Sequence, residues 1–91
     1  MNTPQIMAID TALAIYYKYP EISNKHISAL FGNHSTATIN RLKKRVKAEM
    51  IVRGVHSYSA YSVNTKIAFE IWGIDVDDLE KRRAKLQKLG L

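Results

Sequence analysis

The 91-residue chain contains no cysteine, and it has only two prolines and four glycines. The absence of cysteine excludes disulfide bonds, thiolate nucleophiles and thiolate metal ligands. The sequence also lacks an apolar run long enough to span a bilayer and a basic-then-apolar leader, so we expect a soluble, cytoplasmic protein that does not enter membranes. Repeats and low-complexity tracts are missing as well, and a composition of 46% hydrophobic and 24% charged residues predicts a globular fold.

Signatures of catalysis are equally scarce. The three histidines, His26, His34 and His56, are far apart, and none has a neighbouring carboxylate at metal-ligand spacing. The chain shows no nucleophile elbow, no glycine-rich phosphate loop and no paired acids. We therefore expect a non-enzymatic protein without a metal ion or a cofactor.

Acidic residues are rare in the middle of the chain. Residues 35–66 carry seven basic side chains and one acid, an excess equal to the net charge of +6 of the whole protein. The seven are Arg41, Lys43, Lys44, Arg45, Lys47, Arg53 and Lys66. A local excess of base is typical of a face that binds a polyanion, because each Lys or Arg on a phosphate releases condensed counterions. A basic helix face that is only solvated is the alternative interpretation.

Apolar spacing and capping residues predict two helices before this basic segment. The first begins at Thr3-Pro4 and has one apolar face, formed by Ile6, Ile9, Leu13 and Tyr16. Pro20 ends it and opens a short link. Ser23 is placed to cap a second helix, which Gly32 ends because glycine tolerates left-handed geometry.

A third helix, capped by Ser35 or Thr36, combines an apolar stripe with a polar face. The stripe contains Ile39, Leu42, Val46 and Met50. The polar face contains Ser35, Thr36, Ala37, Asn40, Arg41, Lys44, Arg45 and Lys47. Small residues at the start let such a helix approach a groove closely, while the longer side chains after them reach base edges and phosphates.

The second and third predicted helices, with the turn between them, resemble the helix pair of the winged helix-turn-helix family of DNA-binding proteins. The resemblance extends over roughly residues 5–64. The resemblance is carried by Ile27, Phe31, Gly32, Ile39 and Leu42. Ser28 departs from the pattern, since the family usually has a small alanine there, and the turn is one residue longer than in its tightest form. The resemblance implies a mainly α fold with a short β-hairpin, in which the third helix is the recognition helix for duplex DNA.

The segments 51–56 and 59–63 are rich in strand formers and flank a polar tip, which predicts the hairpin, or wing. In winged proteins this hairpin lies beside the recognition helix and touches the DNA backbone or minor groove. By resemblance, the contacts would come from Arg53, His56, Ser57 and Tyr58.

Two further helices are predicted after the wing, one over residues 66–72, which Asn64 and Thr65 can cap, and one from about Asp77 to Leu89. We therefore divide the chain into a winged helix-turn-helix domain, residues 1–64, and a C-terminal helical extension, residues 65–91. The extension has more apolar residues than a minimal winged domain needs, which predicts a homodimer. The expected dimer residues are Phe69, Ile71, Trp72, Leu79, Leu86 and Leu89. Packing of these helices onto Ile6, Ile9 and Leu13 of the same chain is the alternative.

Together, these patterns predict a sequence-specific double-stranded DNA-binding protein that acts as a homodimeric transcriptional repressor by occluding its site. A close second is an accessory DNA-binding factor of a mobile element, active in plasmid transfer at a relaxosome or in excision. A winged-helix module that binds another protein is a third hypothesis. The sequence leaves these three open.

Overall fold

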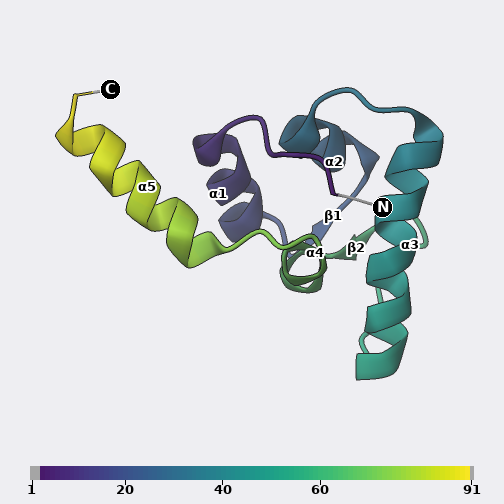
Figure 1. Ribbon diagram of the computed structural model, residues 1–91. Helices are drawn as coiled ribbons and strands as arrows, with labels where there is room; N and C mark the ends of the chain where they lie inside the picture. Colours follow the sequence, from purple (N-terminus) through teal and green to yellow (C-terminus); the bar gives the residue numbers. More distant parts are fainter. Residues whose placement is uncertain (1–2, 91) are drawn as a thin grey trace.

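The computed structural model describes residues 3–90, which form a mainly helical fold with one short antiparallel β element. The elements in chain order are α1 (Ile9–Lys18), β1 (Glu21–Ile22), α2 (Asn24–Phe31), α3 (Thr36–Arg53), β2 (Val63–Asn64), α4 (Thr65–Ile71) and α5 (Val76–Lys88). Helices α3 and α5 lie on opposite sides of the molecule, with α1, α2 and α4 between them (Figure 1). None of the helices within residues 3–90 has the length and apolar composition needed to cross a membrane.

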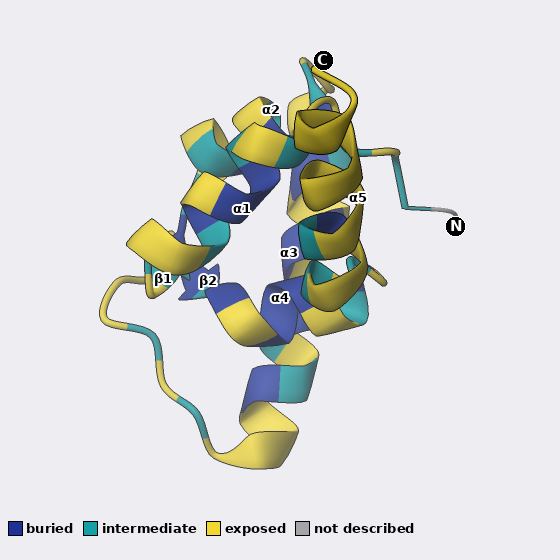
Figure 2. Ribbon diagram, turned by 90° about the vertical axis from the view of Figure 1, so that its left-hand side faces the viewer, coloured by how far each residue is buried: buried dark blue, intermediate teal, exposed yellow. Residues whose placement is uncertain are grey.

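One hydrophobic core joins all five helices. In Figure 2 the buried residues lie on the sides of α1, α3 and α4 that face one another. The indole N–H of Trp72 donates a buried hydrogen bond to the carbonyl oxygen of Leu42, at 3.2 Å, and so links α4 to α3. Residues after 64 therefore belong to the same core as those before it. The largest fully buried apolar side chains are Leu13, Ile22, Ile27, Leu30, Leu42, Val46, Val63 and Phe69.

Most helix ends coincide with the expected capping residues. The hydroxyl of Ser35 accepts the N–H of Thr38 at 3.2 Å, which fixes the start of α3. The side chain of Asn64 accepts the N–H of Ile67 at 3.0 Å, at the start of α4. Gly32 follows α2 with a φ of 85°, a left-handed value that favours glycine.

The first helix begins later than predicted, at Ile9 and not at Thr3. The backbone N–H of Met7 donates to the carbonyl oxygen of Leu30 at 2.7 Å, which ties the preceding segment to α2. Ile6 still packs against the core, although it lies outside the helix. The apolar spacing was therefore correct and the helix start was wrong.

The predicted wing hairpin is not formed by residues 51–56 and 59–63. Helix α3 continues through Arg53, whose ion pair with Glu49 at 2.9 Å spans one helical turn. Gly54 then ends the helix in left-handed geometry, with a φ of 70°. The antiparallel pair is formed by β1 and β2, in which Glu21 lies opposite Asn64 and Ile22 opposite Val63. The strand that pairs with Val63 is thus the link after α1, which the sequence pattern had marked only as a connection.

Candidate nucleic-acid interface

Helix α3 has a buried inner face and an exposed outer face. The inner stripe, as predicted, consists of Ile39, Leu42, Val46 and Met50. The exposed residues of the first half are Ser35, Thr36, Ala37, Asn40, Arg41 and Lys44. Small residues thus precede the longer polar ones along a surface that is open to solvent. We call this surface the outer face of α3.

Arg45 and Lys47 lie on the two flanks of the outer face and hydrogen bond to neighbouring backbone. The guanidinium of Arg45 donates to the carbonyl oxygen of Ile71 at 3.3 Å, at the end of α4. The ammonium of Lys47 donates to the carbonyl oxygen of Ala60 at 2.8 Å, on the other flank. These two side chains hold α3 against α4 and against the loop that follows α3.

Lys43 is a buried residue that sequence reasoning did not single out. Its residue exposure is 7%, and its ammonium donates to the side-chain oxygen of Asn24 at 3.0 Å and to the carbonyl oxygen of Tyr61 at 2.8 Å. Burial, and then the nearby charge of Lys47, lowers the pKa of Lys43 below its usual value. Its position directly after Leu42, near the inward stripe, is the signal that could have found it. Lys43 joins α2, α3 and the loop.

The loop of residues 54–62 is fixed on one flank of α3, mainly by Glu21. The two carboxylate oxygens of Glu21 lie 2.9 and 3.1 Å from the backbone nitrogen of Tyr58, and one of them also accepts the hydroxyl of Ser62. The hydroxyl of Ser57 donates to the carbonyl oxygen of Ser62 at 2.9 Å. Sequence reasoning missed Glu21, because a single acid in a short link carries no motif.

The predicted wing residues differ in their surroundings. Arg53 forms ion pairs with Glu49 at 2.9 Å and with Glu70 at 2.8 Å. Hydrogen bonds to Glu49 and then to Glu70 raise the pKa of Arg53. The chain's own carboxylates therefore compensate this guanidinium. The other three residues lie on the loop. His56 and Tyr58 are exposed, and Ser57 is half-buried.

No family model, curated protein or solved structure matches the chain. The resemblance to winged helix-turn-helix proteins therefore rests on this chain's own residues, and its function has to be inferred from its surfaces.

The outer face of α3 becomes apolar in its last turn. Ile51 and Val52 are 81% and 80% exposed there, and Tyr58 and Tyr61 on the adjoining loop are 92% and 78% exposed. A hollow of about 320 Å³ lies between this turn and the loop, and its lining includes Ile51, Val55 and Tyr58. We call Ile51 and Val52, together with Tyr58, which lines the same hollow as Ile51, the apolar end of α3. Exposed apolar patches rimmed by polar residues often mark interaction sites.

Some of the residues expected to form a dimer surface are buried within the chain, and others are exposed. Phe69, Trp72 and Leu79 are buried within the chain, and Ile71 is partly buried against the same core. The rings of Phe69 and Tyr16 lie 5.1 Å apart, which joins α4 to α1. This is the packing within one chain that the sequence left open. The two leucines of α5 are exposed: Leu86 by 40% and Leu89 by 71%.

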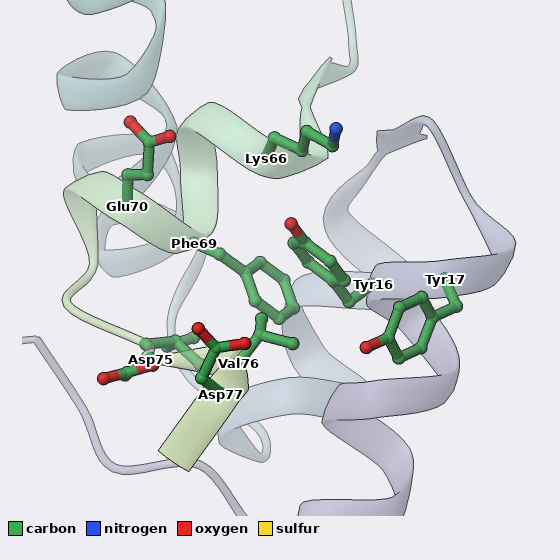
Figure 3. Close-up of a pocket in the computed structure, with 9 residues that line it drawn as sticks. Tyr16, Tyr17, Lys66, Phe69, Glu70, Asp75, Val76 and Asp77 are labelled. Atoms are coloured by element: carbon green, nitrogen blue, oxygen red, sulfur yellow. The ribbon is translucent and has the colours of Figure 1, made fainter. Parts of the chain in front are cut away.

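An open cleft of about 700 Å³ lies between α1, α4 and the start of α5 (Figure 3). Aromatic rings of Tyr16, Tyr17 and Phe69 form part of its wall, and Lys66 lies at its edge. Its remaining charged lining residues are acids: Glu70, Asp75 and Asp77. A mainly acidic lining repels phosphate, so this cleft is not suited to a polyanion.

The three histidines occupy separate places. His26 caps α2, because its Nδ1 accepts the backbone N–H of Ser23 at 3.0 Å. His34, in the turn before α3, has its Nε2 3.0 Å from the carbonyl oxygen of Phe31. His56 lies exposed on the loop. Within residues 3–90, no three histidine or acidic side chains are grouped so that they could hold a metal ion.

Proposed function

We propose that the protein binds double-stranded DNA with the outer face of α3, as a winged helix-turn-helix protein does. The observation that carries this proposal is the exposed first half of α3, where small residues precede Asn40, Arg41 and Lys44. Arg pairs with guanine and Asn with adenine in the major groove, while Lys binds phosphate. Arg41 and Asn40 are therefore the residues for base readout, and Lys44 is the residue for backbone contact.

Loop 54–62 takes the place of the wing in this proposal. It lies on the flank of α3 that carries Lys47, so a duplex against the outer face is within reach of His56 and Tyr58. These two residues and Ser57 contact the sugar-phosphate backbone or the minor groove. Arg53 contributes less, because Glu49 and Glu70 already pair with it.

The proposed role is that of a repressor, with two copies of the chain occupying one DNA site. Occlusion requires no chemistry beyond binding, so it is the simplest role for this surface. Marking a site for the transfer or excision of a mobile element would use the same surface. The exposed apolar end of α3 favours a second candidate function, a winged-helix module that binds another protein.

A titration of duplex DNA at several salt concentrations tests the proposal. The logarithm of the affinity should fall by about 0.9 per log unit of salt for each phosphate contact. Lys44→Ala should weaken binding and reduce this slope by about one contact. Lys85→Ala is the matched control, since it removes the same charge from the exposed surface of α5, on the opposite side of the molecule. A flat salt response, or no duplex binding at low salt, would overturn DNA binding and favour the protein-binding module.

A further inference from the structure

The cleft between α1, α4 and the start of α5 has the size and the aromatic walls of a small-molecule site. Its volume of about 700 Å³ lies within the roughly 300–1,000 Å³ of ligand pockets. The rings of Tyr16 and Tyr17 meet edge to face, with centroids 5.3 Å apart and planes at 85°. The buried ring of Phe69 packs against Tyr16 at 5.1 Å. Two tyrosine rings therefore form adjoining walls at nearly a right angle, and Phe69 supports one of them.

One acid of the cleft, Asp77, is placed to attract a cation. The side chain of Asp75 caps the start of α5. Glu70 pairs with Arg53 at 2.8 Å, and its carboxylate points away from the rings (Figure 3). Asp77 forms no ion pair within residues 3–90. In Figure 3 its carboxylate points toward the middle of the cleft, as does the hydroxyl of Tyr17, so its charge is available to an occupant.

The electrostatics around Tyr17 have the same sign. A hydrogen bond from the Tyr17 hydroxyl to Glu80 is the main reason why the pKa of Tyr17 lies above its ordinary value, and the negative charges of Glu80 and Asp77 add to it. The negative potential that disfavours a phenolate attracts a cation. Lys66, at the edge of the cleft, directs its ammonium away from the rings (Figure 3). Aromatic faces and negative potential therefore coincide at one end of the cleft.

We infer that this cleft binds a small organic ammonium ion, whose cationic head lies against the rings of Tyr16 and Tyr17 and beside Asp77. The face of an aromatic ring attracts a cation, and proteins recognise quaternary ammonium ions with aromatic cages for this reason. The apolar body of the ligand would rest on Ile74 and Val76, which also line the cleft. A free small molecule is the occupant that matches the volume. The site goes beyond the proposed function, since its lining shares no residue with the outer face of α3.

A nuclear magnetic resonance titration of the full chain with choline tests the site. The control ligand is dimethylbutanol, the uncharged isostere in which carbon replaces the quaternary nitrogen. Cation–π attraction at an open site is weak, so choline should bind with a dissociation constant on the order of 1 mM. Dimethylbutanol should bind at least about fivefold more weakly. The amide signals that shift with choline should include those of Tyr16, Tyr17 and Asp77.

Two variants with exposed side chains separate the ring from the charge. Tyr17→Leu keeps apolar bulk without an aromatic face, and Asp77→Asn removes the charge. Each should raise the dissociation constant for choline by about two- to fivefold. Tyr61→Leu is the matched control for the ring, because Tyr61 is an exposed tyrosine on loop 54–62. Asp10→Asn is the control for the charge, because Asp10 lies in the first turn of α1 as Asp77 lies in that of α5. Both controls should bind choline like the wild type.

The comparison of the two ligands needs no variant. Equal affinity of the wild type for choline and dimethylbutanol would overturn the inference. Unchanged affinity in both cleft variants, equal losses in the controls, or shifts confined to residues outside the cleft would do the same. A short lysine-containing peptide that binds tenfold more tightly than choline would make the cleft a contact for a protein partner and overturn the small-molecule assignment. A chain that binds choline as expected but no duplex DNA would overturn the proposed function and leave this site standing.

Discussion

The substitution Glu21→Gln separates the effect of the loop from the effect of charge. Glu21 accepts the backbone N–H of Tyr58 and the hydroxyl of Ser62, and thereby fixes loop 54–62 on the flank of α3. Glutamine has nearly the same shape, but it carries no charge and has one carbonyl oxygen to accept these bonds. The loop should therefore open more often while the helical core stays intact.

The size of this effect follows from the bonds that weaken. A hydrogen bond to a charged group contributes about 1.5–3 kcal/mol, and the half-buried position of Glu21 puts its contribution at the lower end. A loss of about 1–2 kcal/mol corresponds to a roughly 5- to 30-fold change in an equilibrium. Hydrogen exchange at the Tyr58 amide should therefore become about 5- to 30-fold faster.

The direction of the change in DNA affinity distinguishes the effect of the loop from the effect of charge. Glu21→Gln raises the net charge from +6 to +7, so electrostatics alone predicts tighter binding to duplex DNA. If the loop contacts DNA, its release should instead weaken binding. Glu80→Gln on α5 is the control, since it makes the same change in charge on the side away from α3. Equal gains in affinity for both variants, or an unchanged exchange rate at Tyr58, would refute this account of the loop.

Three further changes have defined outcomes. Arg41→Ala should cost about 1–3 kcal/mol of specific DNA binding and relax the preference at one base pair. A selection of bound sites measures this, and equal losses on specific and random DNA would contradict base readout. Burial, and then the charge of Lys25, lowers the pKa of His26 below its ordinary value of about 6.5. The unfolded chain therefore binds the extra proton first, so the free energy of unfolding should fall as the pH drops below about 6.5. His26→Gln, which can still accept the N–H of Ser23, should flatten this decline in denaturant titrations at several pH values, and an unchanged decline would rule out His26 as its source. Trp72→Phe should lower the free energy of unfolding by about 1–3 kcal/mol, because it removes the buried bond to Leu42 and leaves a cavity. Unchanged denaturant stability would argue against a core role for Trp72.

The features that could be predicted from the sequence depend on interactions between residues that are close together in the sequence. Capping at Ser35 and Asn64 uses backbone groups three residues away, and Gly32 reveals a left-handed position by residue type. The buried stripe of α3 follows from helical periodicity alone. For the same reason the exposed outer face of α3 could be predicted from the sequence.

The features that could not be predicted depend on contacts between distant segments. The pairing of β1 with β2 joins Glu21 to Asn64, and no local pattern distinguishes this strand from a simple link. The strand-forming residues at the end of α3 are helical, and there Arg53 forms an ion pair with Glu70 of α4, a contact between distant segments. Lys43 is buried where it binds two distant residues, Asn24, which precedes it in the sequence, and Tyr61, which follows it. In each case tertiary contacts outweigh the local preference of the chain.

The bonds that Glu21, Lys43 and Lys47 make to the loop also determine the thermodynamics of association. A flexible loop would lose conformational entropy on contact with a partner, which reduces the net free energy of binding. Here the carbonyl groups of Ala60 and Tyr61 and the amide of Tyr58 are already held within the chain. Binding should therefore resemble the association of preformed surfaces. Its heat-capacity change should reflect the area of contact, without the additional term that coupled folding introduces.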